Sequence, residues 1–349
     1  MYHAAFINNY SSVILRFILF SLFFAPSAFT REGVEMHFRG ELNAKLVIYM
    51  RLALTPDDSV HGDYLYLTSG KTVPLRGTIK NGKCNITEFN DSTHPTKPSG
   101  RFIGGFKELE FTGGYKQVKL SGMWLSRDSS IFFRFELTRS GPIVETVKTR
   151  KILSFPPSDT ASSDSVVVVK AFAPKITTLG DEKITQKVNA YLDSVMSEYS
   201  YDDTLLYVGQ ENRYAIHYIT DNILSISSGG LDFSRGHAHP NFHSISATLN
   251  LKTGKPLRIK DCFKPSALKK MNALLLDAFI RCIGNGEGFD ITLKPTSENF
   301  TVNAFEITFD LTNCLPHAIQ SCAKISIPLK DLVPFIDPKG PFKIFLVLM

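Results

Sequence analysis

The sequence lacks long apolar runs, a strong net charge and the short motifs of common enzyme classes. No segment after residue 28 is long and apolar enough to span a bilayer as a helix, which needs roughly 20 residues, so we expect no membrane span. The net charge is only +6 and is not clustered, so we expect no nucleic-acid partner. No G-x-S-x-G elbow, H-E-x-x-H helix, P-loop or dinucleotide fingerprint occurs, and we expect no cofactor.

Tryptophan and cysteine are also scarce, with one and five residues, whereas there are 27 phenylalanines and 12 tyrosines. Hydrophobic residues make up 43% and charged residues 21% of the chain, which are ordinary proportions for a globular protein. The length of 349 residues suggests about two domains.

The first residues have the composition of an export signal. Residues 13–15 and 17–24 form an apolar run interrupted by Arg16, and the small residues Ala25, Ser27 and Ala28 follow. This run fits the central part of a secretory signal. We expect residues 1–28 to be a signal peptide and the mature protein to be extracytoplasmic, either periplasmic or secreted. An ordinary buried apolar segment is the alternative interpretation, because the start of the chain carries no lysine.

Export would allow disulfide bonds, and all five cysteines follow residue 28. A helix predicted over 265–281 would separate Cys262 from Cys282 by roughly 25 Å, which disfavours that pair. Cys314 and Cys322 could close a small loop, or either could pair with Cys262 or Cys282. Buried free thiols, including Cys84, are the remaining alternative.

Residues 34–140 have the pattern of an all-β domain, with period-two alternation and turn residues between short segments. We expect an antiparallel β-meander curled into a half-barrel or small barrel. The predicted strands cover residues 42–54, 62–67, 72–79, 84–89, 100–111, 116–125 and 131–137.

Glycine and aromatic residues alternate in this domain. The rings could form a ligand surface or fill the barrel interior, and we favour the interior. The series resembles a small β module of exported bacterial proteins, which implies a β domain without a known chemistry. The matching motifs are Met50-x-Leu52, Gly62-x-Tyr64-x-Tyr66, Leu75-x-Gly77, Gly100-x-Phe102-x-Gly104, Gly122-x-Trp124 and Phe135-x-Leu137.

Residues 141–164 are polar and rich in proline and serine, so we expect a linker there, followed by a second domain over 165–349. Amphipathic periodicity predicts one helix over 181–199 and another over 265–281. β-branched and aromatic runs predict strands, covering 166–171, 214–226, 243–251, 300–311, 324–327 and 342–348. The second domain is therefore expected to be an antiparallel sheet with two main helices, and the whole chain α+β.

The order of motifs in the second domain resembles a bacterial extracytoplasmic domain of unknown function. That domain occurs in a lysozyme-responsive anti-sigma factor and in the non-catalytic part of a peptidoglycan deacetylase. The matching motifs are Phe172-x-Pro174-x-Ile176, residues 221–226, Gly236-x-Ala238-His239-Pro240-Asn241, Leu251-x-Thr253-Gly254-Lys255 and Asp261-Cys262-Phe263. The resemblance implies binding or sensing at the cell envelope. Signalling as an anti-sigma factor is not expected, because the sequence shows no transmembrane helix or sigma-binding segment.

Asp232, His237, His239 and His243 fall within twelve residues. The three histidines could bind Zn²⁺, which would allow a metal-dependent hydrolase if one coordination position stayed open. A polar hairpin loop shaped by Asn241 explains the same residues without a metal. Relatives in the resembling family commonly have glycine at the position of His237, so the resemblance favours the loop.

We therefore expect a non-enzymatic exported binding or sensing protein of the bacterial cell envelope. The expected ligand is a cell-wall glycan or a lysozyme-like protein, and the expected binding residues are Asp232, His237, His239 and Asn241. The alternatives are the hydrolase, centred on His237, His239 and His243, and a structural envelope protein.

Overall fold

The computed structural model describes residues 31–89, 97–112, 115–155, 165–195, 198–200, 209–233, 241–283, 299–312 and 322–346. Residues 31–349 form one compact unit. The predicted signal peptide over 1–28 lies outside the described residues. Among the helices that the structure describes, none is both long and apolar enough to cross a membrane.

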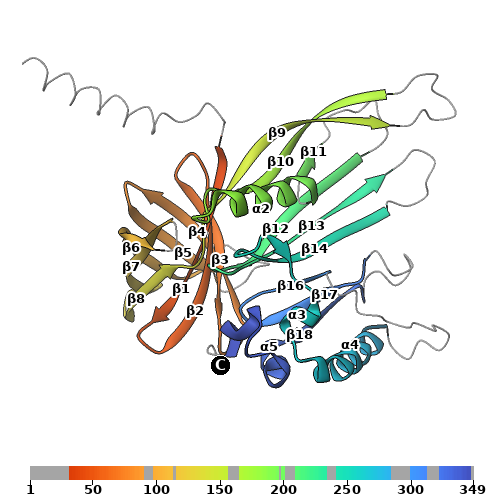
Figure 1. The fold of residues 1–349 in the computed structure, drawn as a ribbon. Helices are drawn as coiled ribbons and strands as arrows, with labels where there is room; N and C mark the ends of the chain where they lie inside the picture. The colour runs from red at the N-terminus through yellow and green to blue at the C-terminus, as the bar shows by residue number, and fades with distance from the viewer. Residues whose placement is uncertain are drawn as a thin grey trace, which may run out of the picture. The chain divides into compact units, whose positions relative to one another are not determined.

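Eight antiparallel strands form a closed barrel, in which each strand pairs with the next and β8 returns to β1 (Figure 1). The strands are β1 (Arg31–Leu42), β2 (Leu46–Leu54), β3 (Ser59–Tyr66), β4 (Thr72–Lys80), β5 (Lys83–Phe89), β6 (Pro98–Thr112), β7 (Tyr115–Ser126) and β8 (Phe132–Arg139). The sequence predicted the meander but not β1, whose pairing with β8 closes the barrel. Gly40 allows this closure, because a Cβ atom there would lie 2.0 Å from the carbonyl oxygen of Glu136.

The barrel core follows from the alternation of side chains along each strand. On β1, Met36, Phe38 and Leu42 belong to the apolar core inside the barrel. Tyr64 and Phe102 are fully buried in the same core. At least these two rings of the glycine–aromatic motifs therefore fill the interior.

Three further strands continue the sheet from the first half of β1. They are β9 (Val144–Phe155), β10 (Ser165–Ile176) and β11 (Glu198–Ser200), in the order β1-β9-β10-β11. A linker was predicted over 141–164. The structure differs from this prediction over 144–155, because β9 lies there and pairs with both β1 and β10. The polar composition of this stretch concealed a strand whose partner, β1, was not predicted. Residues 156–164 lie outside the described part of the chain.

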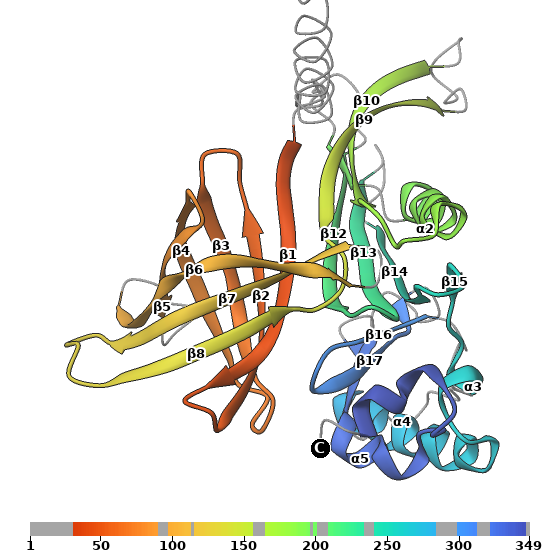
Figure 2. The ribbon, with the colours of Figure 1, turned by 60° about the vertical axis from the view of Figure 1, so that its left-hand side comes forward.

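A second antiparallel sheet consists of β12 (Gly209–Ile219), β13 (Ile223–Phe233), β14 (Asn241–Asn250) and β15 (Lys255–Pro256). Helix α2 (Glu182–Val195) packs against it (Figure 2), with Val188 and Leu192 in one core with Ile226 and Leu249. This helix agrees with the prediction over 181–199 to within a few residues.

A third sheet consists of β16 (Phe300–Val302), β17 (Glu306–Asp310) and β18 (Lys324–Pro328). Helical segments surround it: α3 (Ile259–Cys262), η1 (Pro265–Ala267), α4 (Leu268–Ile283), α5 (Leu329–Leu332), η4 (Val333–Phe335) and η5 (Pro341–Leu346). The predicted strand over 342–348 is wrong for its described residues, because Phe342 and Phe345 enter the core from the 3₁₀ helix η5. The fold is mostly antiparallel β with a few helices, and α+β overall.

One disulfide joins Cys282, at the end of α4, to Cys322, just before β18, with an S–S distance of 2.08 Å. This cross-pairing was one of the alternatives that the sequence left open. Cys84 and Cys262 are buried free thiols, and Cys314 lies outside the described residues.

Candidate functional site

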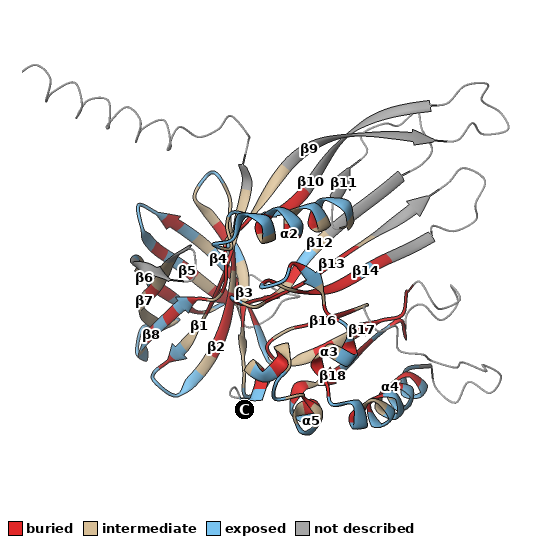
Figure 3. Cartoon of the chain, in the orientation of Figure 1, coloured by how far each residue is buried: buried red, intermediate tan, exposed pale blue. Residues whose placement is uncertain are grey.

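The outer wall of the barrel is buried where β1, β2 and β3 face β12, and we call this contact region the seam. Tyr49 of β2 and Tyr218 of β12 share one apolar core, with ring centroids 4.9 Å apart. The burial view shows buried residues running from the barrel into the second sheet (Figure 3). His37 and Tyr49, on the outward face of these barrel strands, therefore lie in an interior, not on a surface.

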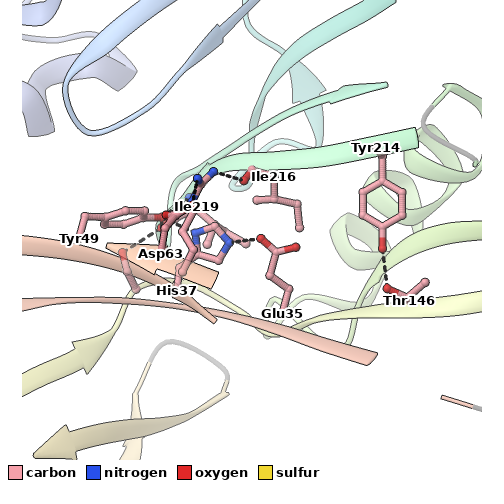
Figure 4. Close-up of polar contacts among 10 residues, drawn as sticks. Glu35, His37, Tyr49, Asp63, Thr146, Tyr214, Ile216 and Ile219 are labelled. Atoms are coloured by element: carbon pink, nitrogen blue, oxygen red, sulfur yellow. Dashed lines mark hydrogen bonds and ion pairs between the residues drawn. The ribbon is translucent and has the colours of Figure 1, made fainter. Parts of the chain in front are cut away.

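A chain of polar groups crosses the seam (Figure 4). His37 is 0% exposed; its Nε2 lies 2.7 Å from a carboxylate oxygen of Glu35, and its Nδ1 lies 2.7 Å from the hydroxyl of Tyr49. The Tyr49 hydroxyl accepts a hydrogen bond from the Ile219 N–H at 2.8 Å and donates to the Ile219 carbonyl at 3.2 Å. Burial raises the pKa of Tyr49 well above its usual value. These contacts join β1 and β2 to β12.

Arg51 and Asp63 form a second polar contact in the seam. The guanidinium donates two hydrogen bonds to the carboxylate, at 2.8 and 2.5 Å, and a third to the Ile216 carbonyl at 3.3 Å. Burial alone would lower the pKa of Arg51, but the hydrogen bond and charge of Asp63 raise it above the usual value. Two parallel N–H···O bonds also fix the orientation of both side chains.

Strand β12 is irregular where it meets the barrel, since its pairing with β13 shifts register between Ile216 and Tyr218. The extra residue is His217, whose Nε2 lies 2.8 Å from the Ser227 hydroxyl. Burial, with the charges of Arg51, Lys324 and His37, lowers the pKa of His217 to about 4, so the ring is neutral at pH 7. A bulge reverses the alternation of faces along a strand, so the residues after it are directed differently from those before.

At one end of the seam lies a pocket of about 510 Å³, which we call the seam pocket. Its volume is within the range of small-molecule sites, roughly 300–1,000 Å³. Barrel strands β1, β2, β7 and β8 contribute to it, as do the end of β12, the β12–β13 turn and η5. The lining residues are Arg39, Gly40, Glu41, Val47, Gln117, Thr138, Arg139, Ser140, Tyr218, Thr220, Asp221, Asn222 and Ile344.

The hydroxyl of Tyr218 and the side-chain carbonyl oxygen of Gln117, both from residues of this lining, are buried and have no hydrogen-bond partner. Tyr218 is 0% exposed, and burial raises its pKa to about 12, although the charge of Arg39 acts to lower it. Since more than nine in ten buried polar groups are hydrogen-bonded, two such atoms in one pocket indicate a place for water or a ligand.

The predicted binding residues are placed only in part. Asp232 pairs with Asn241, and Gly230 pairs with His243, near one end of the β13–β14 ladder. His237 and His239 lie outside the described residues, so neither the binding set nor the metal set can be assembled. Within the described ranges, no group of three His, Cys, Asp or Glu residues could hold a metal ion.

The seam residues were not predicted from the sequence, although a signal was present. Residues 35–42 alternate polar and apolar side chains, apart from Gly40, with Glu35, His37, Arg39 and Glu41 on one face. A titratable group at every second position of a barrel strand indicates an outward face with a polar environment. What the pattern could not indicate is that β12 covers that face.

No family model matches the sequence, and no curated protein matches it. Several solved structures are similar, among them two DUF3298 family proteins. One, a DUF3298 family member from Bacteroides fragilis NCTC 9343, is 13% identical, with a TM-score of 0.40 over 60% of this chain and 98% of that one. The other, a DUF3298 family protein from Pseudomonas aeruginosa PAO1, is 14% identical, with a TM-score of 0.34 over 56% and 94%. Similarity this low assigns no activity.

Proposed function

We propose that this chain is an exported binding protein of the bacterial cell envelope, and that a fragment of the cell wall binds in the seam pocket. The observation that carries the proposal is the pair of unpartnered buried atoms, on Tyr218 and Gln117, in one pocket of about 510 Å³. A ligand with hydrogen-bonding groups would satisfy both atoms, whereas an apolar ligand would leave them unpaired.

Export is supported by the apolar segment over residues 13–24 and by the Cys282–Cys322 disulfide. Disulfides persist in extracytoplasmic compartments and are rare in the cytosol. Cell fractionation combined with thiol trapping tests this part. We expect a processed protein outside the cytoplasm with Cys282 and Cys322 protected from alkylation, and a reduced cytoplasmic protein would contradict it.

The choice of a cell-wall fragment over a lysozyme-like protein follows from the pocket. A volume of about 510 Å³ suits a small ligand or a short segment, and its lining is rich in hydrogen-bonding and charged side chains. A protein partner would need a much wider contact, of about 800 Å² on each side. Resemblance of the second half to a lysozyme-responsive protein keeps lysozyme as the second ligand to test.

The test is calorimetric titration of the mature chain with a soluble peptidoglycan digest and, separately, with lysozyme. We expect heat of binding with the digest, and a loss of at least about tenfold in affinity in Tyr218→Phe. The matched control is Tyr66→Phe, which alters a half-buried tyrosine of the barrel that does not line the pocket. Binding of lysozyme alone, or of neither ligand, would contradict the proposal.

A further inference from the structure

The charges of the seam pocket are distributed by depth. Arg139, at the end of β8, is only 4% exposed, and Arg39 of β1 is half-buried. Glu41 and Asp221, which also line the pocket, are both exposed. The deeper part of the pocket therefore carries the guanidinium groups, and its rim carries the carboxylates.

The inner part also holds the Tyr218 hydroxyl, which can donate a hydrogen bond to an anion. Arg39 is close enough to this hydroxyl for its charge to affect the tyrosine. Guanidinium groups bind carboxylates through charge-assisted hydrogen bonds, which are about twice as strong as neutral ones. A ligand carboxylate directed inward would contact groups of complementary charge.

Gln117 places a different requirement on the ligand. Its unpartnered Oε1 atom is only an acceptor, so it needs an N–H or O–H donor from the ligand. An amide N–H next to a carboxylate, as at the end of a peptide, places a donor and an anion within a few ångströms of each other. A neutral sugar offers hydroxyl donors but no anion for Arg39.

We infer that the seam pocket binds the carboxyl end of a short cell-wall peptide, with its carboxylate toward Arg39 and Tyr218 and an amide N–H toward Gln117. This inference rests on the proposed function and names the part of the cell wall that is recognised. The exposed carboxylate of Glu41 at the rim favours a cationic group further along the same ligand, so the ligand class is a zwitterionic peptide.

The test compares three probes by calorimetry on the mature chain: acetyl-L-Lys-D-Ala-D-Ala with a free carboxylate, the same peptide with a carboxyl-terminal amide, and a neutral N-acetylglucosamine tetramer. We expect the free carboxylate to bind at least about tenfold more tightly than the amide. In Arg39→Gln this preference should fall below about threefold. Arg101→Gln, at an exposed arginine that does not line the pocket, should keep it.

The ratio between the two peptides is measured within each variant, so a small loss of stability does not affect it. Equal binding of the acid and the amide would overturn the inference. Binding of the glycan tetramer but not the peptides, lost in Tyr218→Phe, would also overturn it and would leave the proposed function standing. If no probe and no peptidoglycan digest binds, both fail.

Discussion

Glu88 in the barrel interior and Tyr218 in the seam are both buried polar residues, yet their surroundings differ. The carboxylate of Glu88, which is 5% exposed, accepts hydrogen bonds from the Tyr64 hydroxyl at 2.7 Å, the Ser99 hydroxyl at 2.8 Å and Trp124 Nε1 at 2.8 Å. The hydroxyl of Tyr218 has no hydrogen-bond partner. A fully satisfied cluster stabilises the fold, whereas an unsatisfied group in a pocket reduces stability until a ligand or water binds.

The same contrast occurs within the seam itself. Tyr49 and Tyr218 lie with their rings 4.9 Å apart, but the Tyr49 hydroxyl contacts His37 and both backbone polar groups of Ile219. We therefore assign the Tyr49 hydroxyl a role in stabilising the fold and the Tyr218 hydroxyl a role in binding the ligand. Each of the following variants tests whether this division is correct.

Removal of the Glu88 side chain should have the largest effect. Glu88→Ala removes the shared acceptor of the buried Tyr64 and of the half-buried Ser99 and Trp124, so we expect the free energy of unfolding to fall by about 3 kcal/mol. Denaturant unfolding, followed by the fluorescence of the single tryptophan Trp124, measures both the loss and the local change. The control is Glu136→Ala, at an exposed residue of β8, which should cost under about 0.5 kcal/mol. Equal losses in the two variants would mean that the Glu88 cluster is not structural.

Tyr49→Phe should be the next most costly variant. It removes a hydroxyl from three partners but keeps the ring in the core, so we expect a loss of about 2 kcal/mol. Urea unfolding at pH 7 measures it. If the variant were as stable as the wild type, the polar chain across the seam would not hold β12 to the barrel.

The seam should also be sensitive to acid through His217. The pKa of His217 is about 4 in the folded chain, against an ordinary value of 6.5. The unfolded chain therefore takes up a proton at a higher pH, and the free energy of unfolding falls as the pH drops from 6.5 to 4. We expect a contribution of about 1 kcal/mol, because the ring is only half-buried and water screens part of the effect. His217→Gln should flatten this part of the stability–pH curve, and His61→Gln, at an exposed residue, should not.

Tyr218→Phe should change stability least. The variant removes a buried hydroxyl that has no partner, so we expect a change within about 0.5 kcal/mol, or a small gain, in the absence of ligand. Thermal unfolding of the ligand-free protein measures it. A loss as large as that of Tyr49→Phe would indicate that the Tyr218 hydroxyl is structurally bonded.

Local patterns in the sequence predicted much of the fold. The alternation over 72–79 and 84–89 corresponds to β4 and β5, and the turn between them contains Asn81 and Gly82, both with positive φ. Helical periodicity located α2 and α4 to within a few residues. These elements depend on nearby residues, so sequence patterns were sufficient for them.

Contacts distant in sequence could not be predicted. Closure of the barrel pairs Phe38 with Arg139, and the seam pairs Tyr49 with Ile219, which is 170 residues away. The unpredicted strands β1 and β9 pair with each other. Because β1 was not predicted, β9 had no expected partner in the sheet. Nothing local indicates that Tyr218 would lack a hydrogen-bond partner, because that depends on four barrel strands assembled around it.

The most direct test of the account compares three proteins by calorimetry: the wild type, Tyr218→Phe and Tyr49→Phe. Thermal scans give the melting temperature of each protein, and titration with the peptidoglycan digest gives its affinity. We predict that Tyr218→Phe keeps the melting temperature of the wild type and loses binding by about tenfold or more. Tyr49→Phe should melt at a lower temperature and bind at nearly wild-type affinity at a temperature where it is folded. Wild-type affinity in Tyr218→Phe would contradict the assignment of the seam pocket as the binding site.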